Sequence, residues 1–98
     1  NTTFAVYNSI FNQLDIDLSR CNLDLDNVVI KEIDVLAEST QLLLIDVYGN
    51  SMKYEITNSN MQYYNNDSKK LINKIVLKSV NSQYDIDETV NCGELKIE

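Results

Sequence analysis

Cys21 and Cys92 are the only two cysteines of this 98-residue chain, and their chemistry is the easiest to predict. An even number of cysteines in a small chain outside the cytoplasm favours a disulfide. The bond would close a loop of about 70 residues and contribute roughly 4 kcal/mol to stability. The alternative is two unrelated thiols. No catalytic cysteine is expected, because the chain has no histidine to act as its base.

Acidic residues two positions apart occur in two segments, at Asp24 and Asp26 and at Asp85 and Asp87, with Glu88 following the second pair. This spacing can supply oxygen ligands to Ca²⁺, but an EF-type loop needs a longer ligand series and a central glycine. Solvated acidic loops are therefore favoured, with calcium binding as the alternative. Zinc is disfavoured without histidine. The sequence predicts no metal and no other cofactor.

Tyrosine is the remaining residue type that suggests a site. Tyr54 alternates with polar neighbours and is expected in the core. Tyr63 and Tyr64 are adjacent, so in a strand they must face opposite ways, and one of them is expected at the surface. We therefore take Tyr63 and Tyr64 as a possible partner interface.

Composition limits the function classes. The length fits a single domain over residues 1–98. The net charge of −7 without a basic cluster disfavours nucleic acid as a partner. The longest apolar run, residues 42–45, is far too short to span a membrane. Without histidine, a paired-acid signature, a glycine-rich loop or a nucleophile beside a base, an enzyme is not predicted.

A helix is predicted at the start of the chain, over residues 2–20. Apolar residues recur there at intervals of three and four positions, which places them in one stripe along a helix. This stripe is expected to face the core. The stripe continues to Cys21 and comprises Phe4, Tyr7, Phe11, Leu14 and Leu18.

The rest of the chain is predicted to form strands. Residues 28–36 are rich in β-branched side chains, and Gly49-Asn50 reads as a two-residue hairpin turn between residues 41–48 and 51–57. Further strands are expected at residues 61–64, 71–80 and near residues 95–97. The predicted fold class is α+β, with a long N-terminal amphipathic helix packed on a mostly antiparallel sheet. No internal repeat is predicted.

Three segments resemble a known family. They read MKYEITN at residues 52–58, MQYY at 61–64 and LINKIVL at 71–77, and FNQLDIDL at 11–18 precedes them. This pattern resembles type IV pilins, in particular minor pseudopilins of the ComGF and type II secretion J-subunit kind. The resemblance extends from Phe4 to Ile97. The arginine usual after the tyrosine of the third strand is absent, and so is the family's apolar N-terminal anchor.

The resemblance implies a pilin-like fold, with residues 1–21 as the distal half of the spine helix. It also implies a structural, minor subunit of a type IV pilus or pseudopilus at the cell surface. Its partners would be other major or minor pilin subunits, and it would be held in the membrane before assembly by an upstream helix missing here. The alternative is a stand-alone secreted adhesive or ligand-binding module.

Overall fold

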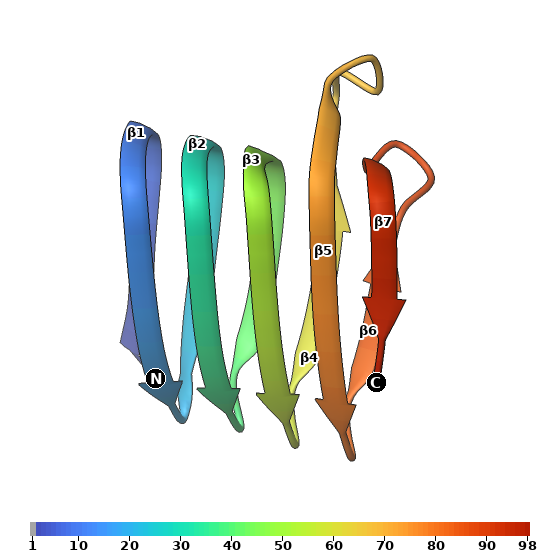
Figure 1. The fold of residues 1–98 in the computed structure, drawn as a ribbon. Coiled ribbons are helices and arrows are strands. Elements are labelled where there is room, and N and C mark those ends of the chain that lie inside the picture. Colours follow the sequence, from blue (N-terminus) through green and yellow to red (C-terminus); the bar gives the residue numbers. More distant parts are fainter. Residues whose placement is uncertain (1) are drawn as a thin grey trace.

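The computed structural model describes residues 2–98, and within them the chain forms strands and no helix (Figure 1). No helix long and apolar enough to cross a membrane occurs in this range. All strand pairs are parallel. The strands are β1 (Thr2–Ser19), β2 (Cys21–Glu38), β3 (Gln41–Thr57), β4 (Asn60–Tyr64), β5 (Leu71–Val80), β6 (Gln83–Ile86) and β7 (Asn91–Ile97).

The chain winds as a flattened parallel β-solenoid, in which each coil lies in register on the next. Paired residues are 19 positions apart from β1 to β2, from β2 to β3 and from β3 to β4. The separation is 23 positions from β3 to β5 and from β4 to β6, and 20 from β5 to β7. We divide the chain into coils at residues 2–20, 21–39, 40–58, 59–81 and 82–98. The expectation of no internal repeat is therefore wrong.

Each coil has two faces. Face 1 contains residues 2–7, 21–26, 41–45, 60–64 and 83–86, and face 2 contains residues 13–19, 32–38, 51–57, 71–80 and 91–97. One long strand bends from face 1 to face 2 in each of the first three coils, as the ribbons of β1, β2 and β3 show in Figure 1. In the last two coils a loop replaces the bend, at residues 65–70 and 87–90. A tight turn then leads to the next coil.

The inward side chains of β2 show how the sequence encodes a coil. They are two positions apart within a face and three positions apart where the strand bends. The additional position at a bend lets the side chains that follow it point inward again. Every one of them is buried: Leu23, Leu25, Val28, Ile30, Ile33, Val35 and Ala37.

Similar side chains stack above one another through the core because the pairing is in register. One column runs through Leu23, Leu42 and Met61, and another through Val35, Tyr54 and Leu77. All six are at most 2% exposed. A single coil has too little core of its own, so burial by its neighbours stabilises it.

The predicted helix over residues 2–20 is wrong, and with it the α+β class and the pilin resemblance. Residues 2–19 form β1, which pairs with β2 along most of its length. Inward residues of a bent strand are spaced by two positions within a face and by three positions at a bend. Some residues of such a series are three or four positions apart, which is also the spacing of apolar residues along one side of a helix. Within that stripe Tyr7 is 53% exposed and Phe4 44% exposed, whereas Phe11, Leu14 and Leu18 pack against the core.

The predicted hairpin at Gly49-Asn50 is also wrong, since both residues lie inside β3 where it bends. The earlier of the two bends in β1, β2 and β3 contains a residue with positive φ, namely Asn8 (51°), Asn27 (58°) or Asp46 (54°). Asn and Asp tolerate this conformation better than most residues. Gly49 is needed for a close approach, because a Cβ atom there would lie 1.8 Å from the Ile30 carbonyl oxygen. The glycine of this pair is thus a packing requirement and not a turn signal.

We expect Gly49→Ala to lower the free energy of unfolding by about 3 kcal/mol, because the Ile30 carbonyl or the bend must move to admit the methyl group. Urea unfolding followed by circular dichroism measures this change. Gly93→Ala is the matched control. Its Cβ would lie 3.0 Å from the Asn73 carbonyl oxygen, a contact that a small shift relieves. The control should stay within about 1 kcal/mol of wild type, and equal losses in the two variants would contradict the assigned role.

Candidate functional site

The tight turns of successive coils line up along one edge of the solenoid, which we call the turn edge. Each turn contains one residue with positive φ: Arg20 (58°), Ser39 (50°), Asn58 (50°) or Asn81 (48°). The backbone ladder continues through these residues, because the N–H groups of Arg20, Ser39 and Asn58 donate to carbonyl groups of the following coil. The turn edge is therefore as regular as the strands that it joins.

A ladder of hydroxyl groups follows the turn residues and fixes the turn edge. The buried Ser59 hydroxyl accepts the Thr40 N–H group at 3.0 Å and donates to the Thr57 carbonyl at 2.8 Å. The Ser82 hydroxyl repeats the arrangement one coil later, with the Ser59 N–H group at 2.9 Å and the Val80 carbonyl at 2.8 Å. Each hydroxyl thus satisfies a backbone donor of the preceding coil, which would otherwise be buried without a partner.

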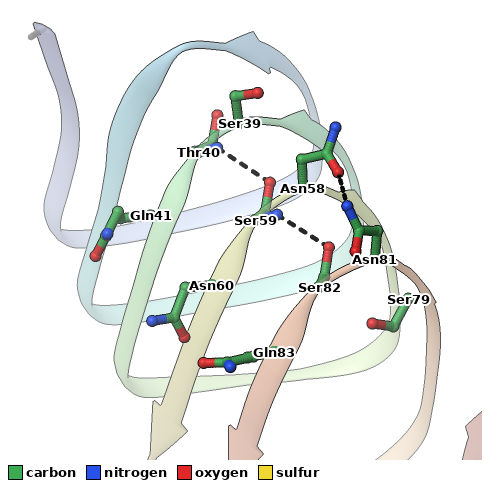
Figure 2. Close-up of a pocket in the computed structure, with 10 residues that line it drawn as sticks. All are labelled: Ser39, Thr40, Gln41, Asn58, Ser59, Asn60, Ser79, Asn81, Ser82 and Gln83. Atoms are coloured by element: carbon green, nitrogen blue, oxygen red, sulfur yellow. Dashed lines mark hydrogen bonds between the residues drawn. The ribbon is translucent and has the colours of Figure 1, made fainter.

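A trough with a cavity volume of about 730 Å³ lies along this edge, and we call it the polar trough (Figure 2). Every residue that lines it is Ser, Thr, Asn or Gln. Neither a charged nor an apolar side chain is among them, although the chain as a whole has a net charge of −7. The lining residues are Ser39, Thr40, Gln41, Asn58, Ser59, Asn60, Ser79, Asn81, Ser82 and Gln83.

Three of these side chains are free to bind a ligand. Gln41, Asn60 and Gln83 are exposed, occupy the same register position on successive coils and make no side-chain hydrogen bond to another part of residues 2–98 (Figure 2). Their backbones repeat at the strand spacing of about 4.8 Å. Asn58 and Asn81, by contrast, are already hydrogen-bonded to each other. The trough therefore presents a row of amide groups, and each amide can both donate and accept.

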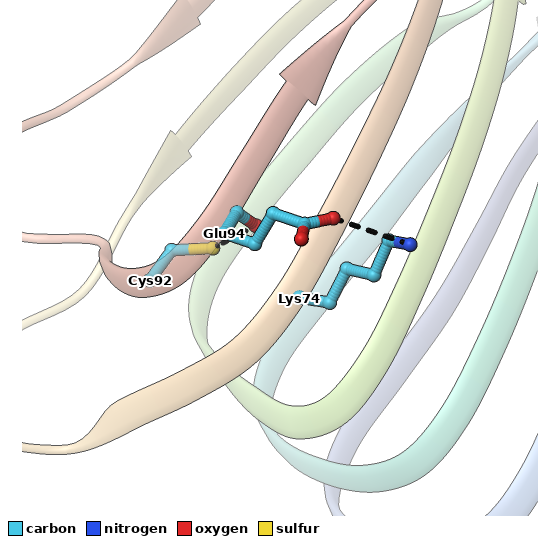
Figure 3. A network of polar contacts seen from close by, with 3 residues as sticks. All are labelled: Lys74, Cys92 and Glu94. Carbon is cyan, nitrogen blue, oxygen red and sulfur yellow. Dashed lines mark hydrogen bonds and ion pairs between the residues drawn. The ribbon is translucent and has the colours of Figure 1, made fainter.

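The disulfide predicted between Cys21 and Cys92 is not formed, since both are free cysteines. Cys21 lies on the second coil and Cys92 on the fifth, so about 14 Å of stacked strands separates them along the solenoid axis. A disulfide requires Cα atoms within about 7 Å of each other. The Cys92 thiol instead donates to the Glu94 carbonyl, beside the 3.2 Å ion pair of Glu94 with Lys74 (Figure 3).

Of the two tyrosines predicted as a possible partner interface, Tyr63 is buried and Tyr64 is 41% exposed. The Tyr63 hydroxyl donates to the Val47 carbonyl, while the Asn65 side-chain oxygen accepts the Val47 N–H group at 3.1 Å. Val47 pairs with Val28 of the second coil but has no strand partner in the fourth coil, where residues 65–70 form a loop. The contacts with Tyr63 and Asn65 take the place of that partner. Tyr63 therefore supports the core, and a partner contact through Tyr64 stays a prediction.

The acidic pairs considered for calcium lie apart, on different coils. Asp24 accepts a hydrogen bond from the Tyr7 hydroxyl at 2.9 Å, which raises the pKa of Tyr7. The Thr89 hydroxyl donates to Asp87 at 2.8 Å and holds the pKa of Asp87 below its ordinary value. Within residues 2–98 no group of three or more acidic, cysteine or histidine side chains is placed to hold a metal ion.

Sequence reasoning missed the polar trough because its residues read as unrelated turn signals. One signal was available, namely the recurrence of polar residues at Ser39-Thr40, Asn58-Ser59 and Asn81-Ser82 with the coil repeat. Recurrence at similar intervals, here 19 and then 23 positions, indicates stacked coils, which bring such residues to one edge.

Ser59→Ala should lower the free energy of unfolding by about 2 kcal/mol, because it leaves the buried Thr40 N–H group without an acceptor. The control is Ser9→Ala. The Ser9 hydroxyl donates to the carbonyl two residues back, as Ser59 does, but its bond is exposed. The control should change stability by less than about 0.5 kcal/mol. Chemical denaturation measures the free energy of unfolding of both variants. An unchanged free energy of unfolding in Ser59→Ala would exclude a structural role for the hydroxyl ladder.

Burial raises the pKa of Tyr54 and of Tyr63 well above the ordinary value near 10. The folded state keeps both protons where the unfolded chain has lost them, so this stability is complete below about pH 10 and declines as the pH rises further. The expected loss is about 1.4 kcal/mol per pH unit for each tyrosine.

Tyr54→Phe isolates one of these two contributions, since the Tyr54 hydroxyl donates only a weak hydrogen bond, to the Met52 sulfur at 3.4 Å. The variant should unfold like wild type at pH 7 and lose stability less steeply between pH 10.5 and 12 by about 1.4 kcal/mol per pH unit. Urea titrations across that range measure both slopes. Identical slopes would show that Tyr54 is accessible to solvent.

Comparison with known proteins assigns no family to the chain. No protein-family model matches it, and no curated protein or solved structure is significantly similar to it. The pilin resemblance therefore has no support from these comparisons, and the parallel solenoid contradicts it.

Proposed function

We propose that the protein is a binding module whose polar trough binds a neutral, hydroxyl-rich chain of the polysaccharide class. One observation carries the proposal: every side chain that lines the trough is an uncharged hydrogen-bonding group. A ligand that fills such a trough must exchange hydrogen bonds with water for hydrogen bonds with amides and hydroxyls. Sugar hydroxyl groups both donate and accept, which matches the amide row of Gln41, Asn60 and Gln83.

The repeat of the trough supports an extended ligand over a compact one. The three amides stand one strand spacing apart along the solenoid axis, so a chain lying along that axis meets the same group on each coil. No aromatic ring is among the lining residues. Recognition would therefore depend on hydrogen bonds in place of ring stacking, with a modest contribution from each amide.

Charge supports a neutral ligand. The trough has no cation to neutralise a phosphate, sulfate or carboxylate group. The net charge of −7 also repels polyanions at long range. The proposal is one of binding and not of catalysis, because no lining side chain titrates near neutral pH and could act as a general acid or base.

The test is binding of neutral oligosaccharides and polysaccharides, including glucans, mannans and galactans, by isothermal titration calorimetry and affinity electrophoresis. Each of the variants Gln41→Ala, Asn60→Ala and Gln83→Ala should weaken binding roughly fivefold, since each removes about 1 kcal/mol of hydrogen bonding. The triple variant should lose measurable binding while its unfolding curve stays close to wild type.

Gln62→Ala is the matched control. Gln62 is an exposed amide on the same strand as Asn60, two positions further along, and lies outside the trough. It should bind like wild type. Lack of binding to every neutral glycan, or equal losses in Gln62→Ala and Asn60→Ala, would contradict the proposal.

A further inference from the structure

We infer, on the basis of the proposed function, that the polysaccharide bound in the polar trough is a straight ribbon whose sugar rings are joined through equatorial bonds, and not a helical chain. The arrangement of the lining residues selects this class of glycan. Figure 2 shows all of these residues except Ser79 in three parallel rows, and the amide row of Gln41, Asn60 and Gln83 is one of them. The other two rows differ from it in the hydrogen bonds that they can still make.

The middle row is the floor of the trough and consists of Thr40, Ser59 and Ser82, which are less exposed than the residues on either side. Each of these side chains donates its hydroxyl proton to the backbone carbonyl two residues back, at 2.8 Å. The floor therefore has no hydroxyl proton to offer a ligand. A sugar chain in the trough must find its hydrogen-bond donors in the two rows that flank the floor.

The third row, which we call the turn row, consists of Ser39, Asn58 and Asn81, the residues with positive φ in three successive turns. The Asn81 amide donates to the side-chain oxygen of Asn58, so these two side chains hold each other in place. Asn58 keeps its own N–H groups for a ligand, and Asn81 keeps its oxygen. Because the turn row has this geometry before binding, little order is gained there on binding, and the row can discriminate between ligand shapes.

Both flanking rows run along the solenoid axis, because successive coils are stacked in register. Gln41 is paired with Asn60, and Asn60 with Gln83, while the turn row lies two positions earlier on the same coils. Each row therefore advances by about 4.8 Å per coil. A straight chain meets both rows on every coil, whereas a chain that curves leaves at least one row after a single coil.

Straight glycans have their hydroxyl groups where this arrangement requires them. When both bonds of each ring are equatorial, as in cellulose-type glucans and in mannans of the same linkage, the chain is an extended ribbon with hydroxyl groups along its two edges. One edge then faces the amide row, the other faces the turn row, and the C–H groups of the ring lie over the floor. An axial bond, as in amylose, turns the chain into a helix and moves successive hydroxyl groups away from the rows.

Cellopentaose and maltopentaose are the matched probes, since they contain the same number of glucose units and differ in the geometry of the linkage. Isothermal titration calorimetry should show roughly tenfold tighter binding of cellopentaose, because maltopentaose loses contacts on at least one coil. Equal affinities, tighter binding of maltopentaose, or binding of other neutral glycans but of neither pentaose would overturn the inference and leave the proposed function standing. Lack of binding to every neutral glycan would instead contradict the proposed function itself.

Asn81→Ser tests the turn row. Serine tolerates the positive φ of this position, as Ser39 shows two coils earlier (50°), and it removes the amide that holds Asn58. The preference for cellopentaose over maltopentaose should fall roughly threefold, while the unfolding curve stays close to wild type.

Asn27→Ser is the matched control. Asn27 also has a positive φ (58°) and donates its amide to an asparagine of the neighbouring coil, Asn8, but it lies at a bend of β2 outside the trough. This variant should keep the wild-type preference. An unchanged preference in Asn81→Ser, or an equal change in the two variants, would overturn the discriminating role of the turn row.

Discussion

Parallel, in-register pairing of successive coils is the constraint on which the rest of this structure depends. The backbone of each strand is paired with the same position of the next coil, so every side chain lies above one of similar environment. A position must therefore suit its whole column and not only its own coil. Inward columns are mainly apolar and outward columns polar or mixed, and departures from the repeat are confined to the loops at residues 65–70 and 87–90.

The two edges of the solenoid satisfy this constraint differently. At the turn edge, hydroxyl and amide side chains maintain the ladder between strands, and the same residue types line the polar trough. At the opposite edge the added residues of the fourth coil interrupt the ladder. There the Asn65 side chain and the Tyr63 hydroxyl replace the missing backbone partners of Val47. The regular edge is therefore the one available for a repeating ligand, while the other edge uses its polar groups internally.

Part of this fold was predictable from the sequence. The alternation of Tyr54 with polar neighbours predicted a strand over residues 51–57 with this side chain in the core, and its burial confirms it. The helix prediction over residues 2–20 was wrong because the residues of a bent strand, which alternate with a period of two except at the bends, also include pairs that are three and four positions apart. The repeat was hidden because a column in the core keeps its apolar character but not residue identity, as Leu23, Leu42 and Met61 show. The trough could not be foreseen without that repeat, since its residues are distant in sequence.

The direction of the hydrogen bonds has a mechanical consequence. Strands run across the solenoid axis and their hydrogen bonds run along it, with β1 at one end and β7 at the other (Figure 1). A force that pulls the two termini apart along the axis therefore loads the bonds of an end coil one after another, as in unzipping, and not all together in shear. Each of the first three coils releases 19 residues of slack chain when it is peeled away, about 60 Å when extended. The domain should thus yield at low force in steps of one coil, and behave under tension as an extensible spacer.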